Sequence, residues 1–257
     1  MVAKRILVTR PEAQSEPLLK AIAEQGDMPI ALPLLKIESI DAAADQVAKQ
    51  TVIDKVVALA NYQHVIFIST NAVQSAWYWI DQYWPQLPVK QTWYAVGQAT
   101  AKEIQKLHLK VEQAGTAMNS ESLLSHQYLQ RLDHQKVLIV RGVGGREHLK
   151  SVLQARGAQV DYCEVYQRQG VCYDKGVFAN ILASGVDILT ATSAETIQRL
   201  LDQAMMDGKQ GETLQIPLVI PGQRLVDFAE ELGFTHIIKA ENAGLQAMLK
   251  ALKQKKQ

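Results

Sequence analysis

The chain contains an approximate internal repeat, which constrains its fold more than any other feature. Residues 138–160, LIVRGVGGREHLKSVLQARGAQV, align with residues 7–29, LVTRPEAQSEPLLKAIAEQGDMP, when 131 is subtracted from each residue number. Five positions are identical, which in the first copy are Leu7, Arg10, Glu16, Leu18 and Gly26. Both copies read as a short apolar run, an arginine, a loop, an amphipathic stretch, a glycine and a second apolar run. This order predicts a strand–helix–strand unit in each copy.

The residue types in each copy fit that prediction. The apolar runs 6–8 and 137–140 suit strands that are buried on both faces. Apolar positions then recur at helical spacing until Gly26 and Gly157, where a helix end favours a residue with positive φ. A second strand is expected at 29–35 in the first copy and at 160–166 in the second.

Two more units recur along the chain. Residues 187–201 repeat the plan of residues 64–80, a strand followed by hydroxyl residues and a helix, with Ser193 aligned to Ser69. Residues 93–111 and 217–237 form another pair, in which His108 takes the place of Gly233. Alternating strands and helices predict two similar domains, each with a parallel sheet covered by helices on both faces. Between the repeated units, residues 36–63 predict one or two helices, and residues 206–215 predict a surface loop.

Composition and charge exclude several classes of function. The 257 residues suffice for one large domain or two ordinary ones, and 47% hydrophobic with 21% charged residues is typical of a globular protein. A net charge of +1 gives no general attraction to nucleic acid or anionic lipid. We expect no signal peptide and no membrane span. Cys163 and Cys172 leave one disulfide open, although two thiols fit a reducing cytoplasm better, and we expect a cytoplasmic protein.

The glycine-rich stretch RGVGGR, residues 141–146, raises the question of a phosphate site. It lacks the Lys-Ser/Thr ending of a P-loop and the full GxGxxG spacing, and its counterpart RPEAQS has no glycine. A nucleotide site is therefore disfavoured. The glycines either bring backbone N–H groups close to a ligand or make a tight turn. The histidines are scattered without metal-binding spacing, so we expect no metal site.

Polar residues follow the predicted strands at their carboxyl ends, the edge where open α/β sheets bind ligands. Some of them could simply cap helices, which stabilises a helix by about 1 kcal/mol, but a capping position also directs free N–H groups at an anion. Together they predict a site for a polar, anionic ligand. The candidate binding residues are Thr9, Arg10, Ser69, Asn71, Gly97, Gln98, Thr100, Arg141, Gly142, Arg146, Thr192, Ser193 and Gly222.

Several short motifs of the chain resemble motifs of one protein family and occur in the same order as in that family. ILVTRPEAQ, PLLKIES, VIFISTNAV, YAVGQATA, LIVRGVGGREHL, GAQVDYCEVYQR and TATSAET are similar to motifs of the uroporphyrinogen-III synthase family. The resemblance spans nearly the whole chain. Its C-terminal part departs from the family's pattern, since Pro221-Gly222-Gln223 stands where small hydroxyl residues are more usual.

The resemblance implies two flavodoxin-like parallel-sheet domains joined by a two-stranded β linker. One domain would be discontinuous, with residues 1–34 and 169–257. The other would span residues 39–164, and the linker strands would lie at 34–39 and 163–168. The family's substrate cleft lies between its domains.

The resemblance also implies an activity. The family consists of lyases that cyclise hydroxymethylbilane to uroporphyrinogen III with inversion of ring D and loss of water, without a cofactor, in haem biosynthesis. The substrate carries eight carboxylates, and Arg10, Arg141 and Arg146 are the leading partners for them, unless they are ordinary surface arginines. We expect a monomer that binds this substrate and product, and neither nucleic acid nor membrane.

Tyr166, in EVYQR, matches a tyrosine that recurs in the family. We hypothesise that its hydroxyl assists the departure of hydroxide by donating a hydrogen bond or proton. Alternatively, Tyr166 is a strand aromatic with a satisfied hydroxyl. The main rival for the whole chain is a non-catalytic bilobal sensor of a small anion, and a nucleotide-dependent enzyme is a more distant alternative.

Overall fold

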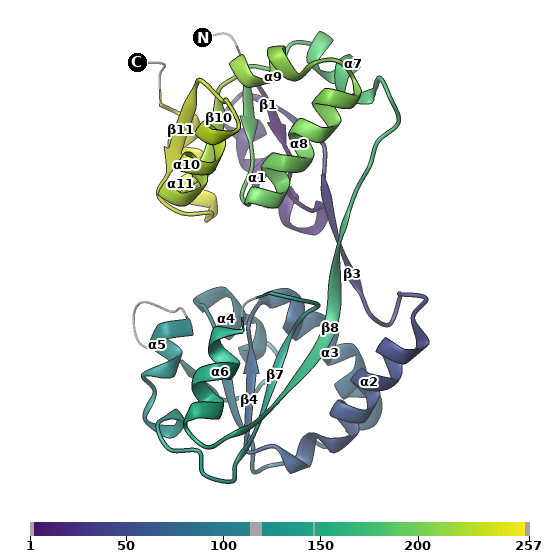
Figure 1. Cartoon of the computed structure of the whole chain (residues 1–257), viewed down its shortest axis with the longest axis vertical. Helices are drawn as coiled ribbons and strands as arrows, with labels where there is room; N and C mark the ends of the chain where they lie inside the picture. The colour runs from purple at the N-terminus through teal and green to yellow at the C-terminus, as the bar shows by residue number, and fades with distance from the viewer. Residues whose placement is uncertain (1–2, 114–119, 146, 255–257) are drawn as a thin grey trace. The chain divides into compact units, whose positions relative to one another are not determined.

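The computed structural model describes residues 3–113, 120–145 and 147–254, and its chain divides into two compact units (Figure 1). Unit 1 comprises Met1–Lys36 and Gln169–Gln257, and unit 2 comprises Ile37–Arg168. The chain leaves unit 1 within strand β3 (Leu35–Ser39) and returns to it within strand β8 (Gln159–Gly170). Unit 2 is therefore an insertion in the sequence of unit 1.

Unit 1 is built on a five-stranded sheet with the order β11-β10-β9-β1-β2, in which all neighbours are parallel. Numbered along the chain within the unit, this is the order 2-1-3-4-5 of flavodoxin-like sheets. The strands are β1 (Arg5–Val8), β2 (Met28–Ala31), β9 (Ile188–Thr190), β10 (Leu218–Pro221) and β11 (Ile237–Ala240). The helices are α1 (Glu12–Glu24), α7 (Val177–Ala183), α8 (Ala194–Met206), α9 (Gln210–Gln215), α10 (Gln223–Glu231) and α11 (Leu245–Leu252).

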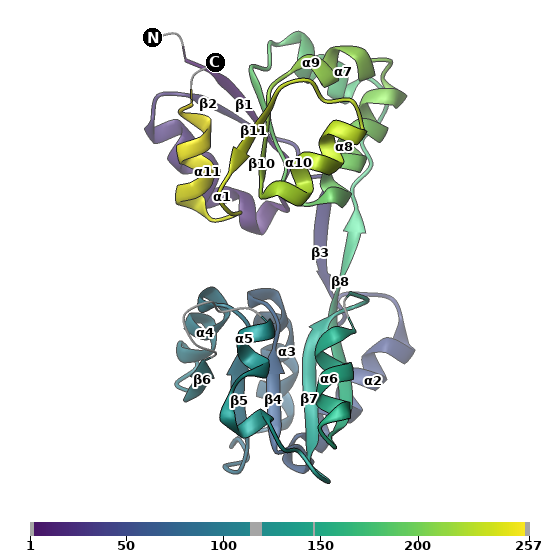
Figure 2. The same cartoon turned by 60° about the vertical axis from the view of Figure 1, so that its left-hand side comes forward.

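The strands of unit 1 bury alternate residues in two separate cores. Leu7 and Leu189 pack with residues of α7, α8 and α10 on one face of the sheet. Ile6 and Ile188, their neighbours in the sequence, pack with α1 and α11 on the other. Figure 2 shows α1 (purple) and α11 (yellow) side by side on that second face. Because both faces are covered, the strands are mostly apolar, as predicted from the runs in the sequence.

Unit 2 has a six-stranded sheet with the order β3-β8-β7-β4-β5-β6. Every pair from β8 to β6 is parallel. The other strands are β4 (His64–Phe67), β5 (Thr92–Ala95), β6 (Val111–Gln113) and β7 (Lys136–Gly142). The helices are α2 (Gln46–Val57), α3 (Thr70–Tyr83), α4 (Gln98–Gln105), α5 (Ser120–Leu124) and α6 (His148–Ala155), with the 3-10 helices η1 (Ala58–Asn61) and η2 (Gln127–Leu129).

The sheet of unit 2 is covered in the same way as that of unit 1. Leu138 and Phe67 pack with α2, α3 and α4. Ile139 and Ile66 pack with α5 and α6 on the opposite face. The prediction of a mixed α/β protein with two helix-covered parallel sheets is therefore confirmed.

Strand β3 is the exception to the parallel arrangement. The N–H of Ile40 donates to the carbonyl of Val165, and the N–H of Val171 donates to the carbonyl of Leu34. Residue numbers rise along β3 as they fall along β8, so the two strands run antiparallel.

The repeat and the units divide the chain differently. β1 and β2 are the counterparts of β7 and β8 in the repeat, yet β1 and β2 complete the sheet of β9–β11, and β7 and β8 complete the sheet of β4–β6. Each half of the sequence thus contributes its first strand–helix–strand unit to the sheet of the other half. In a simple tandem pair of domains, each half of the sequence would instead form a complete sheet by itself.

Local predictions fare unevenly. Gly26 and Gly157 have positive φ as expected, and so do the aligned pair His108 and Gly233. The stretch 36–63 contains α2 and η1, which confirms the predicted helices. The predicted loop at 206–215 is wrong, because α9 occupies its second half, packs on α8 and buries Thr213. Across the described part of the chain, no helix is long and apolar enough to cross a bilayer.

Candidate active site

Each sheet has one topological switch point. It separates strands added in one direction across the sheet from strands added in the other direction. In unit 1 this point lies between β1 and β9, and in unit 2 it lies between β7 and β4. Loops leave neighbouring strands in opposite directions there, which opens a crevice at the carboxyl edge. The predicted site residues that follow these four strands are therefore gathered at two such points, one in each unit.

The switch point of unit 2 carries a pair of hydroxyl groups. Ser69 caps α3 by accepting a hydrogen bond from the N–H of Ala72 at 3.1 Å. Its Oγ also lies 3.2 Å from the hydroxyl of Tyr166, a residue of β8 whose side chain is 2% exposed. The serine is half-buried, so it is the member of the pair that is more accessible.

Gly142 allows the ring of Tyr166 to reach this position. A Cβ atom at residue 142 would lie 2.5 Å from Cε2 of that ring, closer than any side chain permits. The N–H of Val143 also donates to the carbonyl of Tyr166 at 2.8 Å. The glycine predicted as a ligand contact thus has a second reason to be glycine, which is the close packing of Tyr166.

Unit 1 has the same capping geometry, but its cap serine meets a threonine hydroxyl. Ser193 caps α8 by accepting from the N–H of Thr196 at 3.1 Å, and its Oγ lies 2.8 Å from the hydroxyl of Thr196. Thr9 is fully buried and donates to the carbonyl of Thr190 at 2.6 Å. Its hydroxyl therefore joins β1 to β9, while Thr192 is half-buried beside the cap.

Gly97 and Gly222 begin α4 and α10 in matching conformations. Their φ and ψ angles are 94° and 148° for Gly97 and 75° and 157° for Gly222. Neither glycine has a side chain to cap the helix, so first-turn N–H groups point to the carboxyl edge of each sheet. Of the neighbouring predicted residues, Gln98 is exposed and Thr100 is buried. Asn71 lies inside the first turn of α3 rather than at its cap.

The two repeated arginines have different surroundings. Arg10 is half-buried, and one of its terminal nitrogens donates to the carbonyl of Ala243. Its buried Nε has no hydrogen-bond partner among the described residues, and burial lowers the pKa of its guanidinium. An unpaired buried donor is unusual in a folded protein, so Arg10 remains a candidate for contact with a ligand.

Arg141 is 3% exposed, and its charge is compensated within the chain. Its Nη1 lies 3.3 Å from Glu147, its Nε lies 3.9 Å from Glu164, and its guanidinium lies 4.4 Å from the ring centroid of Tyr162. The hydroxyl of Tyr162 donates to Glu147 at 2.7 Å. Burial and this carboxylate raise the pKa of Tyr162 to about 12. The third predicted arginine, Arg146, lies outside the described residues.

Two sequence comparisons bear on the family of this chain. The family described as uroporphyrinogen-III synthase HemD matches residues 16–250. The uroporphyrinogen-III synthase of Escherichia coli is 33% identical over 252 residues, which cover 96% of this chain and 99% of that protein.

The chain belongs to the uroporphyrinogen-III synthase family.

Solved structures named for the uroporphyrinogen-III synthase family share the fold. A mutant uroporphyrinogen III synthase from Thermus thermophilus has a TM-score of 0.62 at 17% identity, with 98% of each chain covered. Uroporphyrinogen-III synthetase from Helicobacter pylori has a TM-score of 0.60 at 16% identity, again with 98% of each chain covered. The predictions of this family, of an enzyme and of uroporphyrinogen-III synthase function are confirmed. The rival interpretation as a non-catalytic sensor is not favoured.

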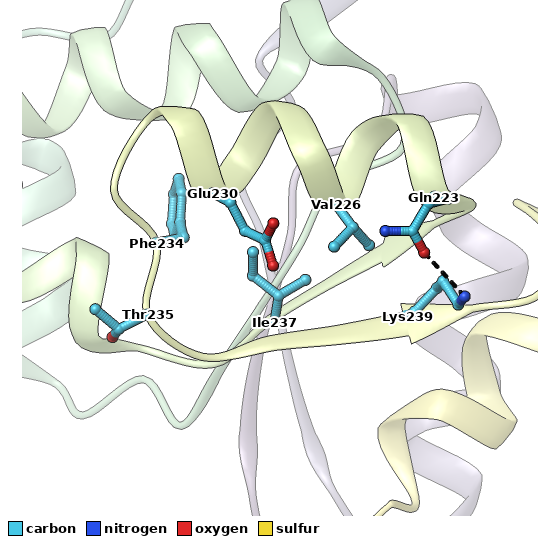
Figure 3. Close-up of a pocket in the computed structure, with 7 residues that line it drawn as sticks. All are labelled: Gln223, Val226, Glu230, Phe234, Thr235, Ile237 and Lys239. Atoms are coloured by element: carbon cyan, nitrogen blue, oxygen red, sulfur yellow. Dashed lines mark hydrogen bonds between the residues drawn. The ribbon is translucent and has the colours of Figure 1, made fainter.

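Lys239, which lies near the carboxyl edge of the sheet of unit 1, was not selected from the sequence. A pocket of about 270 Å³ lies between α10 and β11 (Figure 3). At one end of it, Nζ of Lys239 donates to Oε1 of Gln223 at 3.1 Å, next to Gly222. The signal was a lysine one residue before the end of an apolar strand. The pocket is lined by Gln223, Val226, Glu230, Phe234, Thr235, Ile237 and Lys239.

Glu147 and Glu164 were also missed. Glu147 aligns with Glu16 in the repeat, but nothing in the sequence pairs Glu164 with Arg141. The register of β7 on β8 makes that pair, because it places Arg141 opposite Glu164.

Proposed function

We propose that this chain cyclises hydroxymethylbilane with the hydroxyl pair of unit 2 as its proton-donating group. In the first step the bond from the hydroxymethyl carbon of ring A to its oxygen breaks. The oxygen leaves as water after it takes up a proton, and a positively charged azafulvenium electrophile remains. The substituted carbon of ring D then attacks this electrophile. The resulting spiro intermediate fragments and recloses with ring D inverted, giving uroporphyrinogen III after loss of a proton.

The contact between Ser69 and Tyr166 supports this role. The tyrosine hydroxyl is 3.2 Å from Ser69 Oγ, and the ring is held against Gly142 by packing. Because Tyr166 is almost fully buried and Ser69 is half-buried, the serine hydroxyl is the one that meets the leaving oxygen. Tyr166 donates its hydrogen bond to Ser69, which transfers its proton to the departing oxygen and takes one from Tyr166. The proton released when uroporphyrinogen III forms returns to Tyr166. Proton donation to a leaving group contributes about 10²- to 10⁴-fold to a rate.

The carboxylates of the substrate bind to Arg10 and to helix N-termini in this proposal. Arg10 keeps an unpartnered Nε, and the glycines that begin α4 and α10 leave first-turn N–H groups without a side-chain cap. A helix N-terminus and a guanidinium both favour anions. The remaining predicted binding residues, Thr9, Asn71, Gln98, Thr100, Arg141, Gly142, Arg146, Thr192 and Ser193, surround these donors or hold them in place.

Positioning supplies most of the selectivity. An azafulvene closes without an enzyme to the symmetric type I isomer, so the protein has to hold ring D with its substituted carbon at the reacting position. Holding two groups in a reactive geometry lowers a barrier by about 7–11 kcal/mol in favourable cases. The proposal requires no cofactor.

Three finer points belong to the same proposal. The antiparallel pair β3 and β8 is the two-stranded connection between the discontinuous domain and the inserted one. The chain acts as a monomer, which light scattering would test. It works in the cytoplasm.

A coupled assay tests the proposed function. Hydroxymethylbilane is supplied to the purified chain, and the type I and type III isomers are separated after oxidation. We expect the type III isomer to predominate. A protein that only binds the substrate would leave the type I isomer, and that result would refute the proposal.

A further inference from the structure

A β-bulge lies beside the hydroxyl pair of unit 2. Along β7 and β8, Arg141 is opposite Glu164, but the next residue, Gly142, is opposite Tyr166. One residue of β8, Val165, is therefore extra. A bulge of this kind turns the following side chain and is common next to active sites. It places Glu164 at the start of the irregular segment and Tyr166 at its end.

Glu164 holds the loop that follows the bulge. Its Oε1 accepts a hydrogen bond from the N–H of Gly144 at 3.1 Å and lies 3.9 Å from Nε of Arg141. The same Nε donates to the carbonyl of Gly142 at 3.2 Å. One carboxylate thus joins the loop backbone to the arginine, and the arginine joins it to the glycine that faces Tyr166.

The glycine loop, residues 142–145, packs closely against the side chain of Arg141. A Cβ atom at Gly145 would lie 2.5 Å from Nη2 of Arg141, so a side chain there would push the guanidinium aside. Gly145 has a φ of 105°, and Gly144 has a φ of 73°. Gly145 thus lies close to the guanidinium, which also lies 3.3 Å from Glu147 and 3.9 Å from Glu164.

We infer that Glu164 is a positioning residue for the reaction, acting through Arg141 and Gly142 on the Tyr166–Ser69 pair. This inference rests on the proposed function of that pair. The guanidinium of Arg141 is engaged by two carboxylates and is almost fully buried. The charge of Arg141 is used to hold the loop of residues 142–145. Glu164 thereby fixes the position of Gly142 against the ring of Tyr166.

Glu164→Gln tests this role by the separate effects on kcat and KM. The amide keeps the size of the side chain but removes the charge that holds Arg141. We expect kcat for the type III isomer to fall about tenfold or more, because small displacements of reacting groups slow catalysis strongly. KM should stay within about twofold, since a group that acts only in the transition state changes kcat alone. The share of spontaneous type I isomer should rise.

Asp161→Asn is the matched control. Asp161 lies on the same strand, loses the same charge on substitution, and pairs with Lys55 at 3.1 Å rather than with the glycine loop. Its variant should keep both constants. A raised KM with an unchanged kcat in Glu164→Gln would overturn the inference, because the network would then bind substrate. Unchanged values of both constants would overturn it as well.

Gly145→Ala tests the same network without changing a charge. Circular dichroism shows whether the Glu164→Gln variant is folded. If it is not folded, Gly145→Ala replaces it in the kinetic test. The added methyl group displaces the guanidinium of Arg141, so the same selective loss of kcat is expected, and a normal kcat would refute the inference. The proposed function fails on a different result, which is formation of only the type I isomer by the unsubstituted chain.

Discussion

The switch points of the two units share their backbone and differ in their side chains. Ser69 and Ser193 cap their helices with the same 3.1 Å hydrogen bond, and Gly97 and Gly222 begin helices in nearly the same conformation. The side chains around them have diverged. The difference indicates that N–H donors at helix starts belong to the repeated fold, whereas each unit has acquired its own chemistry.

The arginines and the tyrosine carry this divergence. In unit 2, Arg141 is buried among glutamates and Tyr166 meets Ser69. In unit 1, Arg10 remains half-buried and bonds to a carbonyl, and the repeat position of Tyr166 is Leu35. Under the proposed function, Arg10 of unit 1 would bind a carboxylate and the hydroxyl pair of unit 2 would donate the proton.

Loss of the tyrosine hydroxyl should have the largest effect. Tyr166→Phe removes the hydroxyl that lies 3.2 Å from Ser69 Oγ and leaves the cap of α3 intact, so turnover should fall well beyond tenfold. Stability should change little, by about 1 kcal/mol. Steady-state rates of type III formation measure this. Near-normal turnover would exclude Tyr166 from the chemistry and remove the functional difference between the units.

Neutralising Arg10 should chiefly weaken binding. Arg10→Gln removes a charged partner of a substrate carboxylate, which is worth about 1.5–3 kcal/mol, so KM should rise roughly tenfold to a hundredfold with kcat largely kept. Arg5→Gln, at the other end of β1, removes the same charge away from the carboxyl edge and serves as the control. If both variants raise KM equally, net charge and not the position of Arg10 is responsible.

The two serine caps should be equivalent in stability but not in activity. Ser69→Ala and Ser193→Ala each lose a side-chain cap, so each should reduce the free energy of unfolding by about 1 kcal/mol. Urea unfolding followed by circular dichroism measures this. Only Ser69→Ala should also reduce turnover beyond tenfold. A similar loss of turnover in Ser193→Ala would show that both units take part in the proton transfer.

The smallest expected effect is a pH dependence confined to unit 2. His64 is buried, with Nδ1 3.0 Å from the hydroxyl of Tyr94 and Nε2 2.5 Å from Oε1 of Gln135. Burial lowers the pKa of His64, while the hydrogen bond to Gln135 opposes that change. The folded state therefore favours the neutral ring. Its contribution to stability is present above the unfolded pKa of about 6.5 and is lost as the pH falls towards the lower folded pKa.

Hydrogen exchange can locate this effect. Amide protection in the strands of unit 2 should decrease between pH 7.5 and 5.5, and His64→Phe should reduce that decrease. Unit 1 has Ile188 at the aligned position, so its strands provide the internal control. An equal loss of protection in both units would contradict a specific role for His64.

Local patterns predicted most of the fold because burial repeats along each strand. The apolar runs and the glycines at helix ends identified the strand–helix–strand units, and the serines predicted the caps correctly. The spacing could not predict α9, since a short polar helix has little periodicity and its packing on α8 is a tertiary contact. The compensation of Arg141 by Glu164 depends on a bulge between distant segments, which no local pattern records.

The insertion of one unit within the other also determines the order in which the protein can assemble during synthesis. Ile37–Arg168 is continuous, so unit 2 has all its strands before translation ends. The first two strands of unit 1 are made earliest, but their partners β9–β11 come last. During synthesis, the apolar surface of the amino-terminal segment must therefore stay exposed until β9–β11 leave the ribosome.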